Sequence, residues 1–255
     1  MITGMEVLEL WRYPVKSLRG EALDTATLET DGIEGDRRWG IRDNRTGRIL
    51  TARRRPELLG ASSSYDGDVP VISLPDGAAV SGPGHGTDRA LSEWLDSPVS
   101  LVSSASEDPG RAEFFADATD DASEAIEWTM PQGRYVDSAD VLMLTTASLA
   151  MGRSLHPDGE WDPRRFRPNM LVANSGTDWA EDAWVGHTIQ VGGGGVTPTK
   201  PCTRCTMVTR PQPGLDADVE IFRTLARNHR ATFGVWCDVT APGRVAVGDD
   251  VSVAD

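Results

Sequence analysis

Apolar and polar positions alternate along most of the chain, and this pattern predicts many short β-strands. In the first half, the alternation is clear at residues 5–13 and at residues 22–30. Two further strand patterns, at residues 35–43 and 49–52, flank a turn signal rich in Asn and Gly. Together these two stretches predict a β-hairpin.

The second half contains uninterrupted apolar runs at residues 141–144 and 170–173, which predict buried strands. Further strands are predicted at residues 184–191, 233–239 and 248–253. Helices are predicted at residues 88–95, with Asp88 as the candidate N-cap, at residues 145–152, with Thr145 or Thr146 as the cap, and at residues 219–227.

Residues 103–133 are polar, acidic and poor in periodic pattern, so they predict a long loop or connector. This segment divides the chain into a first domain at residues 1–102 and a second at residues 134–255. Many short strands with few helices favour a mainly β fold with some helices (α+β). In this fold a β-barrel domain follows a smaller β-rich N-terminal domain.

The composition narrows the classes of partner. The chain of 255 residues has a net charge of −14, which argues against a nucleic-acid partner and against an anionic membrane surface. It has no apolar run near the ~18–20 residues that a membrane span requires. The N-terminus lacks the pattern of a signal peptide, and three cysteines in a chain this long favour a reducing, cytoplasmic compartment.

The strongest candidate for chemistry is the pair in Cys202-Thr-Arg-Cys205. A structural zinc site would need further ligands, for which Cys237 and His229 are candidates. A thioredoxin-like dithiol would need a helix after the pair, whereas residues 206–211 look β-like and end in proline. A lone thiolate could instead bind a soft transition metal in the electropositive surroundings that Arg204 and Lys200 supply. The simplest alternative is that both cysteines only pack against neighbouring residues and have no chemical role.

Arginine clusters stand out in this acidic chain, which has 23 Arg but only two Lys, Lys16 and Lys200. The clusters are Arg37 and Arg38, Arg53 to Arg55, and Arg164, Arg165 and Arg167. Arginine offers a planar fork of donors that suits phosphate or carboxylate, so an anionic ligand is one interpretation. Solvated arginines paired with the abundant Asp are the other, and it is the simpler one for any single residue. Lys16 and Ser17 could contact an anion from a loop, and Asp137 and Ser138 could contact a ligand or act as a cap.

Five short motifs occur in a fixed order: Tyr13-Pro-Val-Lys-Ser17, Gly35-Asp-Arg-Arg-Trp39, Leu50-Thr-Ala-Arg53, Arg165-Phe-Arg-Pro-Asn169 and Pro201-Cys-Thr-Arg-Cys205. In order and spacing they resemble the MOSC-domain proteins that carry an N-terminal MOSC β-barrel domain. This family includes the mitochondrial amidoxime reducing component and its bacterial relatives. The resemblance covers nearly the whole chain.

The resemblance implies a molybdenum cofactor, a pterin dithiolene with a terminal phosphate, whose metal is held by one protein thiolate. By motif position, Cys205 is that metal ligand and the catalytic residue. The family's cofactor-binding positions correspond here to Lys16, Ser17, Arg37, Ser138, Arg167, Thr203 and Arg204. These residue types suit such a group, because molybdenum accepts soft sulfur ligands and basic side chains neutralise phosphate. Pyridoxal phosphate binding is a further association at the level of the family.

The implied activity is reduction of N-hydroxylated or related N–O substrates by oxo transfer, in which Mo(IV) takes the oxygen and becomes Mo(VI). Two departures from the family pattern affect this expectation. Relatives of the amidoxime-reducing type often have an acidic residue before a proline where this chain has Thr209-Arg210-Pro211, so substrate preference stays open. The chain ends without the ferredoxin domain of some bacterial relatives, so a separate flavin, haem or iron–sulfur protein would supply electrons.

Two other functions remain open. The protein could be a non-catalytic carrier that binds the molybdenum cofactor, or sulfur on a cysteine, and passes it on. It could also be a β-rich domain that has lost its cofactor and serves in binding.

Overall fold

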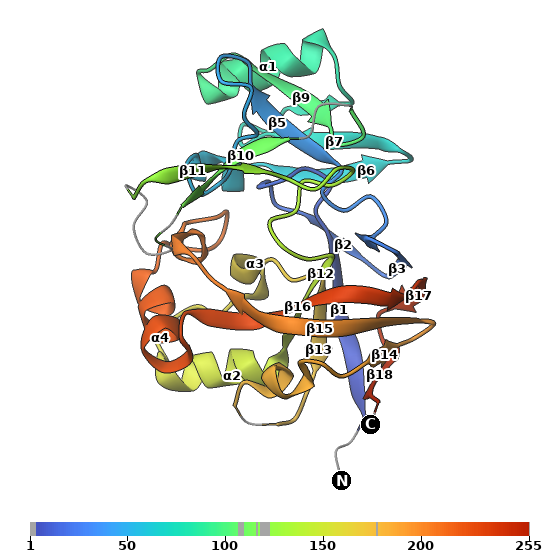
Figure 1. The fold of residues 1–255 in the computed structure, drawn as a ribbon. Helices are drawn as coiled ribbons and strands as arrows, with labels where there is room; N and C mark the ends of the chain where they lie inside the picture. Colours follow the sequence, from blue (N-terminus) through green and yellow to red (C-terminus); the bar gives the residue numbers. More distant parts are fainter. Residues whose placement is uncertain (1–3, 107–109, 116, 118–122, 177, 255) are drawn as a thin grey trace.

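A computed structural model of the protein describes residues 4–106, 110–115, 117, 123–176 and 178–254. Its largest feature is a closed seven-stranded barrel, which occupies the lower part of Figure 1. In order around the barrel, the strands are β13 (Met170–Ala173), β12 (Val141–Thr145), β16 (Thr232–Ala241), β15 (Gly194–Thr203), β14 (Ile189–Val191), β18 (Asp250–Val253) and β1 (Met5–Arg12). The predicted mainly β fold with a barrel is confirmed.

The barrel is closed by the first strand of the chain. Strand β1 runs antiparallel to β13, with Leu10 opposite Met170, and it also pairs with β18. The barrel therefore takes one strand from the segment assigned by sequence to the first domain. The division at residues 102 and 134 itself stays a prediction.

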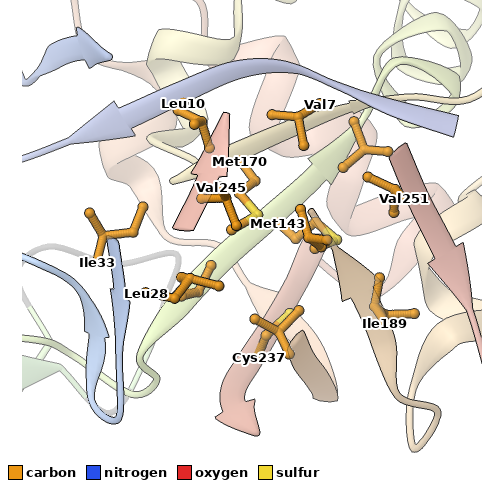
Figure 2. Close-up of a cluster of buried hydrophobic side chains, with 14 of the residues drawn as sticks. Val7, Leu10, Leu28, Ile33, Met143, Met170, Ile189, Cys237, Val245 and Val251 are labelled. Atoms are coloured by element: carbon orange, nitrogen blue, oxygen red, sulfur yellow. The ribbon is translucent and has the colours of Figure 1, made fainter. Parts of the chain in front are cut away.

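Apolar side chains fill the barrel interior. Figure 2 shows Val7, Met143, Ile189 and Val251 pointing toward one another from different strands. Each of these side chains is at most 4% exposed. Burial of one such side chain contributes about 1.5–3 kcal/mol, so this cluster accounts for much of the stability of the barrel.

A second apolar layer lies outside the barrel. Three helices supply it, namely α2 (Thr146–Leu155), α3 (Pro163–Phe166) and α4 (Val219–His229). All five residues of β12 are buried, because one face points into the barrel and the other packs against this layer. Thr145 caps α2 by accepting a hydrogen bond from the Ser148 amide at 3.1 Å, which confirms the prediction of a threonine cap.

The remaining elements form small sheets, most of them above the barrel in Figure 1. The upper sheets consist of β5 (Trp39–Asp43) with β9 (Val99–Ser103), and of β6 (Ser62–Asp66), β7 (Val69–Ser73) and β8 (Ala79–Ser81), with α1 (His85–Leu95) packed on them. A further small sheet consists of β3 (Thr25–Glu29), β4 (Gly32–Ile33) and β17 (Gly243–Ala246), whereas β2 (Glu21–Leu23) pairs with β1 of the barrel. The 3-10 helices are η1 (Pro56–Gly60), η2 (Ala180–Trp184) and η3 (Thr206–Thr209).

Two local predictions in this upper part are wrong. The strand partner of β5 is β9 rather than residues 49–52, where only Ile49 forms an isolated bridge to Arg42. Helix α1 begins earlier than predicted, with Gly84 as its N-cap. The Asp88 carboxylate instead accepts a hydrogen bond from the Leu101 amide at 2.9 Å, so it ties the helix to β9.

The predicted loop at residues 103–133 contains an antiparallel hairpin, formed by β10 (Arg111–Phe115) and β11 (Ala125–Thr129). The prediction of a structureless connector is wrong over these two strands. Their alternation is short and is flanked by acidic residues. The pairing also depends on distant partners, since Arg48 forms ion pairs with Glu113 and Glu127, both at 3.2 Å. Figure 1 shows the hairpin between the upper sheets and the barrel.

Two further predictions need adjustment. Residues 206–211 were expected to be β-like, but η3 occupies most of this stretch. In the predicted strand at residues 184–191, only β14 is extended. None of the helices in the described part of the chain has the length and apolar character needed to cross a bilayer.

Candidate functional site

Two adjoining cavities lie where the barrel meets the upper sheets and the β10–β11 hairpin. We call them the inner cavity and the outer chamber. The inner cavity brings together all eight residues singled out from the sequence: Lys16, Ser17, Arg37, Ser138, Arg167, Thr203, Arg204 and Cys205. Residues that line both spaces are Lys16, Ser17, Asp137, Ser138, Thr203, Arg204, Cys205, Met207 and Trp236. The sequence therefore located one site from segments about 190 positions apart, although the roles of these residues stay predictions.

Cys205 lies at the boundary between the two spaces. Strand β15 carries prolines at positions 198 and 201, and its register with β16 shifts next to each of them. Such irregularities bend a strand and end its pairing, so the chain leaves the barrel wall after Thr203. Cys205 follows as the extended N-cap residue of η3. Its side chain is partly exposed in the common wall of the two cavities.

The thiol of Cys205 is not preset as a thiolate. Burial raises its pKa and outweighs the Met207 amide and the guanidinium groups of Arg53 and Arg204, which act in the opposite direction. Arg204 thus supplies part of the predicted electropositive surround, and the role of Cys205 as a metal ligand stays a prediction. Lys200, the other basic residue invoked, lies over the ring of Trp236, with Nζ 4.9 Å from the centroid.

Arg204 is held by backbone carbonyl groups. Its Nε and Nη2 donate to the Phe233 carbonyl at 2.8 and 2.5 Å, and its Nη1 donates to the Phe166 carbonyl at 2.8 Å. Gly234, which follows Phe233, has φ of +74°, and a Cβ there would meet the Met143 carbonyl oxygen at 2.7 Å and Arg204 Nη2 at 3.4 Å, so this position favours glycine. Arg204 is only 7% exposed and forms no ion pair with a carboxylate in the described ranges.

Arg37 and Arg167 both pack on the ring of Tyr13. Their guanidinium carbons lie 4.8 and 4.3 Å from its centroid. Arg167 Nη1 also donates to the Leu18 carbonyl at 2.7 Å, and burial lowers the pKa of Arg167 to about 10. Within the part of the chain that the structure describes, no carboxylate forms an ion pair with Arg167.

Three residues of this site adopt the left-handed backbone conformation, which non-glycine residues seldom enter. They are Ser17 with φ of 70°, Arg37 with φ of 52° and Arg167 with φ of 57°. Each such residue costs on the order of 1–3 kcal/mol, and such costs tend to cluster at functional sites. The conformation of Arg167 also ends α3, for which Arg167 is the C-cap.

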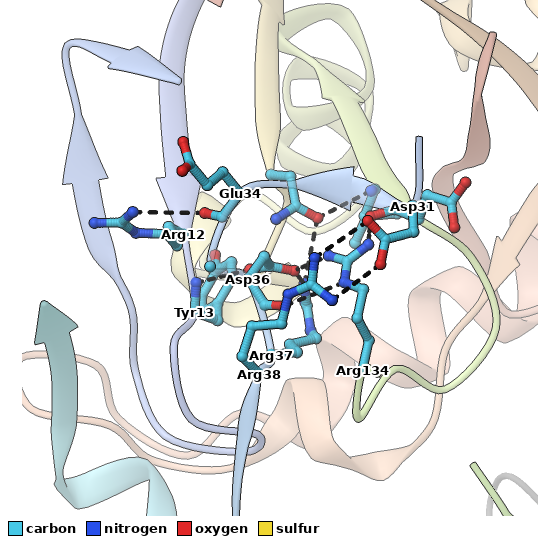
Figure 3. A network of polar contacts seen from close by, with 12 residues as sticks. Arg12, Tyr13, Asp31, Glu34, Asp36, Arg37, Arg38 and Arg134 are labelled. Atoms are coloured by element: carbon cyan, nitrogen blue, oxygen red, sulfur yellow. Dashed lines mark hydrogen bonds and ion pairs between the residues drawn. The ribbon is translucent and has the colours of Figure 1, made fainter. Parts of the chain in front are cut away.

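A buried acidic group positions Arg37. Asp36 is fully buried; it accepts from the Tyr13 amide at 2.8 Å and from Arg134 Nη2 at 3.0 Å, and it forms an ion pair with Arg37. Figure 3 shows these side chains converging from separate segments. The sequence analysis did not assign a role to Asp36 or Arg134. Asp36 stands inside the motif at residues 35–39, but its partner Arg134 lies 98 positions away.

Lys16 lies at the edge of the inner cavity. Although it is only 5% exposed, its ammonium group donates to the Tyr135 carbonyl at 3.1 Å and forms an ion pair with Asp137. The Asp137 side chain is 83% exposed and lines both cavities, so this pair lies on the cavity surface. The exposed Ser138 follows Asp137 in the chain. Asn169 also lines the inner cavity, although the sequence analysis gave it no role, and its side chain donates to the Trp11 carbonyl at 3.2 Å.

The balance of charge in the inner cavity favours an anionic ligand. Its four cationic side chains are Lys16, Arg37, Arg167 and Arg204, whereas only Asp36 and Asp137 offset them. Arg167 and Arg204 are both buried and both held by neutral carbonyl groups. Uncompensated buried charge is costly, and an anion bound among these groups would offset that cost.

The zinc and dithiol hypotheses do not fit this geometry. Cys237 lies fully buried in the barrel core, and His229 Nε2 lies 2.7 Å from an Asp182 carboxylate oxygen. Among the described residues, no group of three or more metal-ligating side chains is assembled. Both Cys202 and Cys205 are free thiols, and the segment after them is the short η3 rather than a helix of several turns. Cys202 is buried, and burial raises its pKa to about 11.

The outer chamber adds to the shared residues several that the sequence analysis did not place in this site. Besides the shared residues, its lining consists of Thr51, Ala52, Arg53, Glu113, Phe115 and Lys200. Three of these belong to one of the five motifs, at residues 50–53, and could have been found there. Glu113 and Phe115 belong to β10, which the pattern did not reveal.

Comparison with known proteins adds independent findings. A family model described as "MOSC domain" matches residues 131–252, and another described as "MOSC N-terminal beta barrel domain" matches residues 4–119. Mitochondrial amidoxime-reducing component 1 of Homo sapiens is 28% identical over 289 residues, which cover 96% of this chain and 82% of that protein. Its Mus musculus counterpart is 26% identical, with coverages of 96% and 81%. Molybdenum cofactor sulfurase of Solanum lycopersicum is 26% identical over 86% of this chain but only 31% of its own length.

Proposed function

Because the chain belongs to the MOSC-domain proteins that carry an N-terminal MOSC β-barrel domain, we propose that it is a molybdenum-cofactor-dependent reductase of N-hydroxylated or related N–O compounds. The names of its amidoxime-reducing relatives support the reaction, and that of the molybdenum cofactor sulfurase supports the cofactor. The observation that carries the proposal is the inner cavity, where one partly exposed cysteine lies beside two buried arginines that form no ion pair with any described carboxylate. No finding supports pyridoxal phosphate.

The inner cavity fits such a cofactor in charge and in donor type. The cofactor is anionic through its phosphate, and four cationic side chains line this space. Cys205 would be the metal ligand, while Lys16, Arg37 and Arg167 would neutralise the phosphate. Hydroxyl groups of Ser17, Ser138 and Thr203, together with Arg204, would bind the pterin.

When bound, the cofactor would supply two-electron oxo-transfer chemistry at its metal. The chain would hold it in place and shape the approach to it. Asp36 fixes Arg37, and backbone carbonyl groups fix Arg167 and Arg204, so these donors need no rearrangement to meet an anion. Cys205 lies in the wall shared by both cavities, so a substrate would reach it through the outer chamber, where Phe115, Met207 and Trp236 limit access of water.

The proposal includes a separate electron-donor protein containing flavin, haem or an iron–sulfur cluster. The word "component" in the names of the amidoxime-reducing relatives supports such a system. We further propose that the protein acts in the cytoplasm, in line with three free cysteines among the described residues.

A non-catalytic carrier of the cofactor, or of sulfur, is the second candidate. The similarity to molybdenum cofactor sulfurase favours it. A carrier would contain cofactor but would reduce no N-hydroxylated substrate, and mass spectrometry would find a persulfide on Cys205 or Cys202. The outer chamber favours the reductase, because a carrier has no need of an apolar space beside the thiol.

Turnover of an aryl amidoxime tests the reductase directly. Protein expressed in cells that make the cofactor would be assayed with a reduced viologen dye as the electron source. We expect turnover by the unmodified protein, loss of at least about a hundredfold in Cys205→Ala and retention of most activity in Cys202→Ser, because only the first change removes a metal ligand. Cofactor-loaded protein without turnover, or full activity in Cys205→Ala, would contradict the proposal.

A further inference from the structure

The outer chamber has apolar walls on several sides. Ala52, Phe115, Met207 and Trp236 contribute them from four separate segments. Phe115 is 4% exposed, and the guanidinium carbons of Arg53 and Arg54 lie 4.2 and 4.6 Å from its ring centroid. This ring is therefore held in place by the upper part of the molecule, and the small part of it that faces the chamber forms a fixed apolar contact for a ligand.

Most charged groups of this chamber are already engaged. Lys16 is paired with Asp137, and the Arg204 guanidinium donates to carbonyl groups. Glu113, the carboxylate of the hairpin, forms ion pairs with Arg48 at 3.2 Å and with Arg54 at 2.8 Å. Lys16 and Arg204 also line the inner cavity, where the proposed function assigns them to the cofactor, and Glu113 would repel an anion, so none of the three is the group that would bind an anionic substituent in the outer chamber.

Lys200 differs from them. It is exposed on β15, its ammonium nitrogen lies 4.9 Å from the Trp236 ring centroid, and it has no ion pair or hydrogen bond with any residue that the structure describes. Arg53, another cation of this chamber, packs on Phe115, whereas Lys200 is an exposed positive charge at the edge of the apolar walls, in a chain of net charge −14 with only two lysines. A lysine ammonium on a flexible stem can turn toward a ligand anion, and the one contact it would give up here is the exposed one with the Trp236 ring.

The chain spacing limits the size of the ligand. Lys200 and Cys205 are five positions apart, so their Cα atoms lie at most roughly 18 Å apart even if that segment were fully extended. A ligand that reaches from the Cys205 thiol to the Lys200 ammonium is therefore a small molecule, and a single ring with two substituents lies within this upper bound. The ring would lie between Phe115 and Trp236.

We propose that the outer chamber selects N–O substrates with a flat aromatic body and a carboxylate at the end remote from the N–O group. Lys200 is the residue that binds the carboxylate, and Phe115 and Trp236 pack on the ring. This assignment rests on the proposed function for the identity of the reacting end, whereas recognition of the carboxylate depends on this chain's residues alone.

Two ligands that differ in one group test the proposal, namely benzamidoxime and 4-carboxybenzamidoxime. Equilibrium binding of each would be measured by titration calorimetry on the cofactor-loaded protein. We expect the carboxylated compound to bind roughly tenfold more tightly, an advantage that Lys200→Gln lowers to about one and that salt weakens. Phe115→Ala should weaken both compounds by a similar factor and so leave the ratio largely unchanged.

Arg89→Gln is the matched control. It removes one positive charge from an exposed position on α1, where Arg89 forms only a 3.9 Å ion pair with Glu93, so the ratio of the two affinities should stay at the value of the unmodified protein. Equal affinities in the unmodified protein, or a ratio that Lys200→Gln leaves unchanged, would overturn the assignment.

Failure of the proposed function would look different. In that case the unmodified protein would turn over neither compound, yet the affinity ratio and its dependence on Lys200 would persist. If the function holds, the ratio of the two KM values should follow the ratio of affinities in each variant.

Discussion

The inner cavity and the outer chamber share a wall but are built by different kinds of contact. In the inner cavity, cationic side chains are buried and fixed by backbone carbonyl groups or by the buried Asp36. In the outer chamber, the hairpin wall is attached through partly exposed ion pairs such as that between Glu113 and Arg54. Buried polar contacts are costly to break, whereas exposed pairs contribute little.

This difference indicates a division of labour. The inner cavity is organised before any ligand arrives, at a cost in backbone strain and buried charge, which suits tight retention of one anionic group. The outer chamber has a wall that can change with little effect on folding, which suits the selection of substrates. Substitutions in the two spaces should therefore separate stability and cofactor retention from substrate choice.

The largest expected effect is on stability, at Asp36. Asp36→Asn leaves Arg37 and Arg134 without their buried carboxylate, so we expect the free energy of unfolding to fall by roughly 3–5 kcal/mol. Denaturant titration would measure the loss. Glu93→Gln breaks only an exposed pair and should change stability by less than about 0.5 kcal/mol. Equal small changes in both variants would show that Asp36 does not organise the inner cavity.

Arg167 should separate retention of the cofactor from folding. Arg167→Met removes a buried cation that has no carboxylate partner among the described residues, so the free energy of unfolding should change by no more than about 1 kcal/mol. Affinity for the anionic cofactor should nevertheless fall at least about tenfold, because a charge-assisted hydrogen bond is lost. The protein would be dialysed at a series of concentrations, and the molybdenum that each sample retains would measure this affinity. Undiminished retention would remove Arg167 from the proposed site.

A smaller effect is expected at the hairpin. Glu113→Gln removes the ion pairs with Arg48 and Arg54 and should lower stability by at most about 1 kcal/mol. The KM for aryl amidoximes should rise about 3-fold, because the hairpin holds the ring of Phe115 less firmly in this variant. Molybdenum content should not change. Loss of metal in this variant would break the distinction between the two cavities.

The smallest effect concerns pH and lies outside both cavities. Burial lowers the pKa of His229, but hydrogen bonds with Asp182 and with the Thr232 carbonyl outweigh it, and the net shift is upward. The folded state therefore binds this proton more tightly than the unfolded state. The resulting stability is fully present below the ordinary histidine pKa and is lost as pH rises through the raised value.

Unfolding titrations between about pH 6 and pH 8 would measure this decline in stability. His229→Gln should flatten it without affecting molybdenum content. A decline of the same slope in His229→Gln would assign the pH dependence to other groups.

The barrel was largely predictable from sequence, whereas the details of the site were only partly so. The apolar runs of β12 and β13 reveal strands buried on both faces, and Thr145 marks the start of α2. The hairpin of β10 and β11 was missed because its strands are stabilised by arginines far away in sequence rather than by a local apolar pattern. Closure of the barrel by β1 is likewise a non-local pairing that periodicity does not encode.

For the site, the five motifs contain seven of the eight residues, and Ser138 lies outside them. The motifs did not show how these residues are held. The left-handed conformations of Ser17, Arg37 and Arg167 could not be predicted, because glycine, the residue that usually marks such a conformation in a sequence, is absent at these positions. Asp36 was quoted within a motif without a role, because its partner Arg134 is visible only once the chain has folded. The residue types indicated which groups could bind an anion. Only the folded structure showed which of these groups form no ion pair with a described carboxylate.

The most direct test of the central claim is the metal and pterin content of the purified protein. Protein produced in cells that make the cofactor would be analysed by inductively coupled plasma mass spectrometry, and the oxidised pterin would be measured by its fluorescence, with Cys205→Ala prepared in parallel. The account predicts molybdenum and pterin equimolar with the unmodified chain, and molybdenum strongly depleted in Cys205→Ala. Unmodified protein without molybdenum, or equal molybdenum in both proteins, would contradict it.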